Sequence, residues 1–265
     1  MDEFDLDAGT HEFYDDPRFY DHEFQYRRSD VWWYGEQYLD TDGPVLELAI
    51  GSGRVAVRAV RDGATVIGLD LSQSMLRRCA ERRSKLPRKR QSSLHLVRGD
   101  MRNFAFNRRF DLITCPFNAF MHLYTVEDVE RCLRCVKRAL SPDGVFIVDV
   151  LMPDFEFLSR SPFKRYVGPR LKHPVHGSYY TYSEQSAYDP VRQLNQMWFH
   201  YDRIEAEAPG PESFVVQLSH RYFYPRELEA LMHFNGLQVL QMLGDFKGGP
   251  LTGDSESIIA LVGHR

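Results

Sequence analysis

The sequence is short of three features that mark particular classes of protein: cysteine, long apolar runs and a strong excess of one charge. Only four of its 265 residues are cysteines, which is typical of a reducing compartment. There is no run of 18 apolar residues, and the N-terminus lacks the basic-then-apolar pattern of an export signal. The formal net charge of −4 argues against general nucleic-acid binding. We therefore expect a cytoplasmic protein with no nucleic-acid or membrane partner.

The cysteines and histidines show no spacing that is typical of a metal site. Cys132 and Cys135 form a single C-x-x-C pair on an expected helix, and no second pair or histidine completes a zinc site. His173 and His176 flank a proline in a loop, and no other His, Asp or Cys follows or precedes them at a spacing typical of metal ligands. We expect buried thiols and no metal ion.

Charge is spread unevenly along the chain. Residues 1–23 hold nine acids and one arginine, so we expect this terminus to be mobile or to form a solvated lid edge. Residues 77–90 hold eight basic residues and one acid. No aromatic residues lie between those positive charges, which favours a solvated helix and loop over a nucleic-acid contact.

The most informative segment is a short apolar strand that runs into a glycine turn. Residues 45–53 read Val-Leu-Glu-Leu-Ala-Ile-Gly-Ser-Gly, and a second apolar run, residues 66–70, ends on Asp70. Two such strands joined by a helix are typical of a nucleoside site. The glycines let the backbone approach the ligand, and the acid accepts the ribose hydroxyls.

The identity of the nucleoside depends on Glu47, four residues before the first glycine. The spacing Gly51-Ser-Gly53-Arg-Val-Ala56 satisfies a relaxed dinucleotide pattern, so an NAD site is one interpretation. A pyrophosphate at this turn would lie beside the Glu47 carboxylate, an unfavourable pairing of like charges. A ligand without phosphate that carries an ammonium and a sulfonium suits the acid better, and S-adenosylmethionine is such a ligand.

Three later motifs follow in order and favour S-adenosylmethionine over NAD. Gly99-Asp-Met101 ends a third strand, Phe110-Asp-Leu-Ile113 begins a fourth, and Pro142-Asp-Gly144 precedes a fifth. Together with the segment 47–53 and Asp70, they resemble the class I S-adenosylmethionine-dependent methyltransferases over about residues 40–152. The resemblance implies S-adenosylmethionine as cofactor. It also implies donor contacts from Glu47, Ala49, Gly51, Gly53, Asp70, Leu71, Met75, Asp100, Met101 and Pro116.

The order of expected elements predicts an α/β, Rossmann-like fold. Strands at 44–49, 65–70, 94–98, 110–115 and 144–150 alternate with helices at 54–61, 72–84 and 125–139, which predicts a doubly wound, mostly parallel sheet of seven strands. The last two strands are expected at 237–243 and 256–263, after a helix at 225–235 begun by Pro225. Segments 177–188, 193–206 and 213–224 alternate like antiparallel strands.

These elements suggest four segments along the chain. We expect an N-terminal helical cap (1–42), a donor-binding core (43–152), an antiparallel insertion after the fifth strand (153–224) and a C-terminal helix with two strands (225–265). In the fold that the chain resembles, such an insertion lies over the carboxyl ends of the strands. Its aromatic residues would then line an enclosed pocket for a small molecule.

The candidate catalytic base is His122, on the segment that follows the fourth strand. A histidine near its ordinary pKa can take a proton from an ammonium or a hydroxyl group at neutral pH. The alternative, left open here, is a structural histidine that caps the helix starting near residue 125. In the N-terminal segment, Tyr14 is the second candidate at the acceptor site. Tyr20 and Arg27 are candidates for the donor, with Arg27 pairing with its carboxylate.

A narrower resemblance is to the amino-sugar N,N-dimethyltransferases. It rests on Gly99-Asp-Met-Arg102, on the His122-Leu pair and on the insertion. In that family, residues matching His122 and Tyr14 line the acceptor site. The segment 248–256 keeps a Gly-Gly-Pro but lacks the arginine that the family places near its substrate's phosphates, which disfavours a nucleotide-linked sugar. Thr114-Cys-Pro-Phe117 also lacks the Asn/Asp-Pro-Pro-Tyr motif of base-modifying enzymes.

The sequence therefore predicts an S-adenosylmethionine-dependent methyltransferase, present as a monomer or a homodimer. Its acceptor would be the N or O atom of a small molecule. Two other hypotheses remain: an NAD-dependent oxidoreductase, and a catalytically inactive methyltransferase fold that serves as a binding module.

Overall fold

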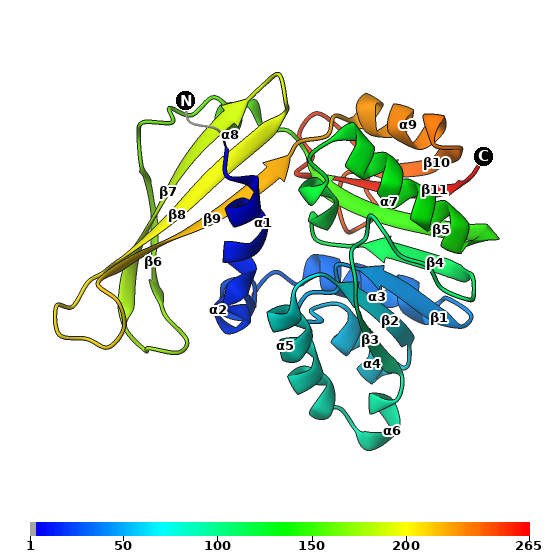
Figure 1. Ribbon diagram of the computed structural model, residues 1–265, viewed down its shortest axis with the longest axis horizontal. Coiled ribbons are helices and arrows are strands. Elements are labelled where there is room, and N and C mark those ends of the chain that lie inside the picture. Colours follow the sequence, from blue (N-terminus) through cyan, green and yellow to red (C-terminus); the bar gives the residue numbers. More distant parts are fainter. Residues whose placement is uncertain (1–3) are drawn as a thin grey trace. The chain divides into compact units, whose positions relative to one another are not determined.

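Residues 4–265 are described in the structure, a computed structural model, and their elements are drawn in Figure 1. The chain forms two compact units. The first comprises the chain up to Gln25 together with Pro153–Tyr222, and the second comprises Tyr26–Met152 with Phe223–Arg265. The four-segment division expected from the sequence stays a proposal.

The second unit is built on a seven-stranded sheet. From one edge to the other it runs β10 (Leu237–Leu243), β11 (Ser257–His264), β5 (Leu140–Leu151), β4 (Phe110–Cys115), β1 (Pro44–Leu48), β2 (Thr65–Asp70) and β3 (Leu94–Arg98). The five strands from β5 to β3 are mutually parallel, and β11 is antiparallel to both β5 and β10. The predicted α/β class and mostly parallel sheet are confirmed.

Helices cover both faces of this sheet (Figure 1). One face carries α3 (Ser29–Leu39), α4 (Ala56–Asp62), α5 (Gln73–Ser84) and the short α6 (Arg88–Gln91), and the other carries α7 (Val126–Ala139) and α9 (Pro225–Phe234). Tyr34 and Tyr38 of α3 are fully or almost fully buried in the apolar cluster that α4 and α5 complete. On the opposite face, the Phe120 ring packs between Phe146 and Phe223. Burial on two faces explains why the parallel strands are nearly continuous apolar runs.

The helix starts follow from local capping. The Ser72 hydroxyl accepts a hydrogen bond from the Met75 backbone N–H at 3.3 Å and so caps the start of α5. Thr125 caps α7 in the same way through the Asp128 backbone N–H, so no histidine is needed there. Pro225 occupies the first turn of α9, where its missing N–H costs nothing.

One strand begins earlier than expected. The motif Pro142-Asp-Gly144, which was expected to precede the fifth strand, already belongs to β5, which starts at Leu140. The register between β4 and β5 shifts between Phe110 and Leu112. An irregularity of this kind takes up extra residues within a ladder, so the strand continues without a loop.

The first unit holds a four-stranded antiparallel sheet. Its order is β6 (Tyr166–Lys172), β7 (Tyr179–Asp189), β8 (Leu194–Arg203) and β9 (Ser213–Arg221). Three of these strands were predicted, and β6 was not, because Gly168-Pro169 interrupts its pattern. Helix α1 (Leu6–Asp15) packs on β9, where the Glu12 carboxylate accepts a hydrogen bond from the Gln217 backbone N–H. The helix thereby covers an otherwise open sheet edge.

The described residues of the acidic terminus, from 4 onward, are largely helical, so the expectation of a mobile terminus is wrong for them, whereas the alternative of a solvated lid edge stays a prediction. Helices α1 and α2 (Pro17–Glu23) form there because some of the acids act as caps. The Asp5 carboxylate accepts from the Ala8 backbone N–H, and Asp16 accepts from two N–H groups of α2. The buried rings of Phe13 and Phe19 hold these helices in the first unit. Residues 1–3 of the predicted cap lie outside the described residues.

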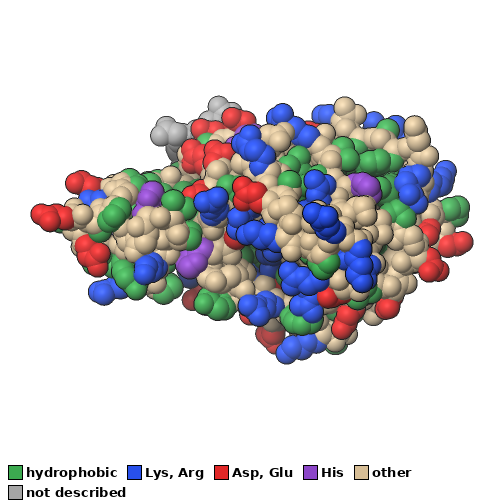
Figure 2. All heavy atoms as spheres, turned by 90° about the horizontal axis from the view of Figure 1, so that it is seen from below, with side chains coloured by type: hydrophobic (Ala, Val, Ile, Leu, Met, Phe, Trp, Pro, Cys, Tyr) green, Lys and Arg blue, Asp and Glu red, His purple; other side chains and the backbone are tan. Residues whose placement is uncertain are grey.

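The basic segment 77–90 forms the exposed side of α5 and α6. Figure 2 shows Lys and Arg side chains gathered on the face where these helices lie. Several of these side chains are tied to the protein itself: Arg83 donates to the Leu94 carbonyl, and Arg90 donates to the Gly63 carbonyl. Within residues 4–265, no helix is long and apolar enough to cross a membrane.

Candidate active site

The turn after β1 brings three residues with positive φ to the carboxyl end of the sheet. The φ angles of Ala49, Gly51 and Gly53 are 53°, 58° and 77°. A Cβ on Gly53 would lie 2.5 Å from the Cys79 sulfur, so this glycine is required by close packing against α5. A Cβ on Gly51 would meet only the Ala49 carbonyl oxygen, at 4.0 Å. The first glycine therefore leaves an open surface on which a ligand can lie against backbone.

Asp70 joins this turn to the end of β2. One of its carboxylate oxygens accepts a hydrogen bond from the Gly51 backbone N–H at 2.6 Å, and the other accepts from the Ser72 backbone N–H at 2.8 Å. Burial raises the pKa of Asp70 to about 6, against the effect of these bonds. The Leu71 backbone N–H also lowers this pKa. A carboxylate has about four acceptor sites, so Asp70 can still accept a hydrogen bond from a ribose hydroxyl.

Glu47 lies beneath the turn and is almost completely buried. The Tyr38 hydroxyl donates to its carboxylate at 2.8 Å, and that hydroxyl is itself 2.6 Å from the Thr114 hydroxyl. Desolvation raises the pKa of Glu47 to about 8, although the Tyr38 hydrogen bond and the charge of Arg54 lower it. Burial therefore disfavours the negative charge expected from the sequence, and a positively charged ligand would favour it.

Asp100, after β3, is held by its own neighbour. The Arg102 guanidinium donates to both carboxylate oxygens at 2.8–3.0 Å, and it also reaches Asp128 of α7 at 3.1 Å. Partial burial would raise the pKa of Asp100, but the hydrogen bonds and charge of Arg102 lower it overall. Asp100 is therefore a fixed, charged acceptor beside Met101.

The segment after β4 makes a tight turn that Asp149 holds in place. Phe117 and Asn118 both have positive φ, 59° and 62°, which is costly for a phenylalanine. The Asp149 carboxylate, at the end of β5, accepts from both of their backbone N–H groups at 2.9 and 3.1 Å. It also accepts from the Tyr34 hydroxyl at 2.6 Å. Burial raises the pKa of Asp149 to about 6 despite these three donors.

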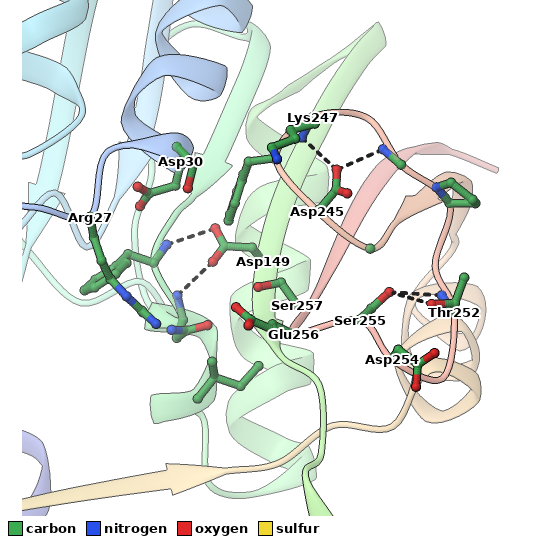
Figure 3. A pocket seen from close by; sticks show the side chains of 18 residues that line it. Arg27, Asp30, Asp149, Asp245, Lys247, Thr252, Asp254, Ser255, Glu256 and Ser257 are labelled. Carbon is green, nitrogen blue, oxygen red and sulfur yellow. Dashed lines mark hydrogen bonds between the residues drawn. The ribbon is translucent and has the colours of Figure 1, made fainter. Parts of the chain in front are cut away.

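A cavity of about 500 Å³ opens beside this turn, within the second unit (Figure 3). The start of α3, the turn after β4, the end of β5 and the β10–β11 loop enclose it. Its lining residues are Arg27, Ser29, Asp30, Phe117, Asn118, Asp149, Leu151, Gly244, Asp245, Phe246, Lys247, Gly249, Pro250, Thr252, Asp254, Ser255, Glu256 and Ser257. The volume suits a small molecule.

Most of the predicted donor residues lie along the carboxyl edge of the sheet, and we call the ends of β1, β2 and β3 the donor half. Pro116 is buried just before the turn after β4, whereas Leu71 is exposed beside Asp70. Met75 is buried in α5. Arg27 is found at the cavity, and its carbonyl accepts a hydrogen bond from Arg54. Its pairing with the donor's carboxylate stays a proposal.

The two predicted catalytic residues, and Tyr20 with them, do not line the cavity. His122 ends the short helix η1 (Ala119–His122), and its Nδ1 lies 3.2 Å from the Tyr124 hydroxyl. It is not among the residues that line the cavity. Tyr14 and Tyr20 belong to the first unit, where their rings contact each other and Phe13. The roles predicted for all three stay predictions.

Apart from Arg27, sequence reasoning missed the residues that shape the cavity. We call the ends of β4, β5 and β10 and the start of β11 the cavity half of the edge. Asp149 had a visible signal, an acid inside the apolar run 145–151. Asp30 had none, because an acid in the first turn of a helix is ordinary. Its carboxylate pairs with Arg54, which in turn stacks on the Phe117 ring at 4.0 Å.

Comparison with known proteins agrees with this geometry. A family model described as "Methyltransferase domain" matches residues 45–144. A glycine/sarcosine N-methyltransferase of Halorhodospira halochloris is 30% identical over 208 residues, which cover 77% of this chain and 68% of that protein. A dTDP-3-amino-3,6-dideoxy-alpha-D-glucopyranose N,N-dimethyltransferase of Streptomyces fradiae is 32% identical over 105 residues, 40% of this chain and 38% of that protein. Apart from the glycine/sarcosine N-methyltransferase of Halorhodospira halochloris, the curated relatives named by the comparison are matched over half of their length or less.

A solved structure shares the fold across nearly the whole chain. The CcbJ methyltransferase from Streptomyces caelestis superposes with a TM-score of 0.73 at 22% identity, covering 90% of this chain and 95% of that one. Seven strands in this order, with a glycine turn after the first and an acid after the second, define a class I methyltransferase fold. The chain belongs to the class I S-adenosylmethionine-dependent methyltransferases. This family uses S-adenosylmethionine, so the predicted family and its cofactor are confirmed.

Proposed function

We propose that this protein transfers a methyl group from S-adenosylmethionine to a nitrogen or oxygen atom of a small molecule. The observation that carries the proposal is the pairing of two features on one sheet edge. An open glycine turn with the Asp70 carboxylate lies at one half of the edge, and a cavity of about 500 Å³ lies at the other. Kinship with N-methyltransferases that act on glycine or amino sugars favours nitrogen.

The donor half fits the cofactor by its chemistry. S-adenosylmethionine supplies a methyl group activated by a positively charged sulfur. Asp70 would accept the ribose hydroxyls and Asp100 the adenine amino group, with Met101 against the ring. The backbone at Ala49 and Gly51 would face the amino-acid part, above the buried acid of Glu47. The contacts proposed for Tyr20, Arg27, Gly53, Leu71, Met75 and Pro116 complete the set.

The rate would come chiefly from positioning. A tight turn at residues 117–118 and the cavity beside it can hold an acceptor in line with the carbon–sulfur bond, which replaces a bimolecular encounter by an oriented one. His122 would remove a proton where the acceptor needs it, a contribution of typically about 10²–10⁴-fold. We place Tyr14 at the acceptor as well. We also propose a cytoplasmic monomer or homodimer.

The first test is the affinity for the demethylated product, S-adenosylhomocysteine. Calorimetry should give micromolar binding to the wild-type protein, and Asp70→Ala should abolish it while the fold persists. A thermal-shift comparison with NAD addresses the oxidoreductase alternative. Stabilisation by NAD and not by the adenosyl ligand would overturn the proposal. Failure to bind either ligand would leave the inactive binding module as the better hypothesis.

The second test concerns His122. His122→Ala should reduce turnover of an identified acceptor by about 10²-fold or more with little change in donor affinity, since a general base acts only on the chemical step. Turnover that survives the substitution would assign His122 a structural role.

A further inference from the structure

The cavity beside the turn after β4 carries an excess of negative charge. Its charged lining side chains include five acids, which are Asp30, Asp149, Asp245, Asp254 and Glu256. Only two bases, Arg27 and Lys247, line it as well. Asp254 and Glu256 are exposed at the β10–β11 loop (Figure 3). A cavity lined in this way attracts cations and repels phosphate groups.

One of these acids has a hydrogen-bonding atom that the protein does not use. Asp30 is only 4% exposed, and its Oδ2 atom is paired with Arg54. Among residues 4–265, no group lies in hydrogen-bonding position to its other oxygen, Oδ1. A buried carboxylate oxygen without a donor is costly, and a ligand N–H that paired with it would remove the cost. Oδ1 itself has almost no accessible surface, so a ligand in the cavity would reach it once the Asp30 carboxylate turns toward the cavity that the residue lines.

Asp149 differs from Asp30 in this respect. Its carboxylate already accepts from the Tyr34 hydroxyl and from two backbone N–H groups. Asp245 likewise accepts from the backbone N–H groups of Lys247 and Gly249 within its own loop. The open acceptor among the buried acids of the cavity is therefore Oδ1 of Asp30.

The cavity and the donor half lie at the ends of different strands of the same sheet. The glycine turn, Asp70 and Asp100 lie at the ends of β1, β2 and β3, whereas the cavity lies at the ends of β4, β5 and β10 and the start of β11. Strands β3 and β5 are separated by three intervening strands in the sheet order. The two halves meet at the turn after β4, which is where a methyl group could pass from one to the other.

We infer that this cavity binds the methyl acceptor and that the acceptor is a phosphate-free amine, held as an ammonium ion by the Asp30 carboxylate. This inference rests on the proposed function and names the substrate class of the same site. It separates this chain from those relatives whose names specify dTDP-linked sugars, because two phosphates would face the excess of acids.

Transfer requires one deprotonation of the bound ammonium. The nitrogen releases a proton to solvent, directly or through a base, and its lone pair forms the new nitrogen–carbon bond. The carbon–sulfur bond breaks, and its electron pair stays on sulfur, which becomes a neutral thioether. Asp30 is therefore a binding residue that orients the nitrogen.

The test measures binding to the protein saturated with S-adenosylhomocysteine. The probes are two amines, benzylamine and cyclohexylamine, their neutral counterparts benzyl alcohol and cyclohexanol, and thymidine diphosphate. Binding of each probe is measured by thermal shift and calorimetry at pH 7. We expect the amines to bind at least about tenfold more tightly than the alcohols, because a charge-assisted hydrogen bond replaces an unfilled one. Thymidine diphosphate should not bind in the cavity.

Asp30→Asn should weaken amine binding roughly tenfold or more while changing S-adenosylhomocysteine affinity by less than about twofold. The matched control is Asp62→Asn, which also removes an acid paired with an arginine but lies on α4, outside the cavity. If Asp30→Asn does not fold, the exposed pair Asp254→Asn and Glu256→Gln should still weaken amine binding a few-fold at low salt.

Each outcome bears on one proposal. Absence of S-adenosylhomocysteine binding defeats the proposed function itself. Product binding without any preference for amines over alcohols overturns the present inference alone. So does an Asp30→Asn variant that loses product affinity as strongly as amine affinity, because Asp30 would then hold the donor. Tighter binding of thymidine diphosphate than of the amines would also overturn it.

Discussion

The donor half and the cavity half share one sheet edge but are built in different ways. In the donor half, the key contacts join residues that are close along the chain: Gly51 and Asp70 are 19 residues apart, and Asp100 and Arg102 are two apart. In the cavity half, the Tyr34 hydroxyl meets Asp149 across 115 residues, and the β10–β11 loop closes the cavity from the far end of the chain. One half is assembled from consecutive motifs, and the other from the completed sheet.

This difference has an energetic side. In the donor turn, two of the three left-handed conformations fall on glycines, which adopt them without a side-chain penalty, and one falls on Ala49. The cavity half holds Phe117 and Asn118 in left-handed conformations by means of a distant buried carboxylate. Loss of that carboxylate should therefore disturb the cavity more than any single change in the donor half disturbs the donor turn.

The largest effect is expected at Asp149. Asp149→Ala removes the acceptor of three hydrogen bonds and leaves the Tyr34 hydroxyl and two backbone N–H groups unpaired. The free energy of unfolding should fall by about 3 kcal/mol. Chemical denaturation measures it, and Asp143→Ala is the control, since Asp143 is an exposed acid on the same strand. A loss no larger than that of the control would mean that the turn holds itself.

The second effect compares the two glycines of the donor turn. Gly53→Ala combines a strained φ with a Cβ placed 2.5 Å from the Cys79 sulfur, and should lower the free energy of unfolding by about 2 kcal/mol. Gly51→Ala meets open space and should cost only about 1 kcal/mol of strain. Its larger consequence should be weaker binding of S-adenosylhomocysteine, measured by calorimetry. Equal stability losses in the two variants would contradict this assignment.

The same contrast explains what the sequence could predict. Strand ends with short motifs, such as Glu47 to Gly53 and Asp70, predicted the core strands, the sheet type and the family, because each motif carries its own local geometry. The β6 strand was missed because Gly168-Pro169 breaks its alternation. The acidic terminus was misjudged because a count of charges does not show which acids cap helices, as Asp5 and Asp16 do.

For the site as well, local motifs could be predicted from the sequence and contacts between distant residues could not. The Glu47 carboxylate was expected to be charged, yet only the structure brings Tyr38 and Thr114 around it and buries it. Asp30 could not be found because its proposed role depends on an oxygen to which none of residues 4–265 donates a hydrogen bond. An unfilled hydrogen-bonding position is a property of the three-dimensional arrangement, and no residue pattern encodes it.

The third prediction uses the pKa of Glu47, which burial raises to about 8. Below that pH the acid is protonated, and a cationic ligand lowers its pKa, so binding releases a proton. The affinity for S-adenosylmethionine should therefore rise with pH by up to roughly tenfold per unit until about pH 8. Calorimetry from pH 6 to 8.5 measures the slope.

The control for this pH profile is Glu47→Gln, which keeps the shape of the side chain and removes its titration. The ligand's own amino group titrates equally in both proteins, so the difference between the two slopes reports Glu47. Identical slopes would show that the ionisation of Glu47 is not linked to donor binding.

The smallest effect is expected at Arg102, which links the two acids Asp100 and Asp128 in the donor half. Its side chain is 34% exposed, so Arg102→Met should lower the free energy of unfolding by less than about 1 kcal/mol. The affinity for S-adenosylhomocysteine should fall only a few-fold, because Asp100 stays charged but loses the guanidinium that orients it. The affinity of Arg102→Lys for S-adenosylhomocysteine should lie between those of the wild type and Arg102→Met, since lysine keeps the charge without the bidentate geometry. A stability loss in Arg102→Met as large as that of Asp149→Ala would remove the distinction between a donor half held by local contacts and a cavity half held by distant ones.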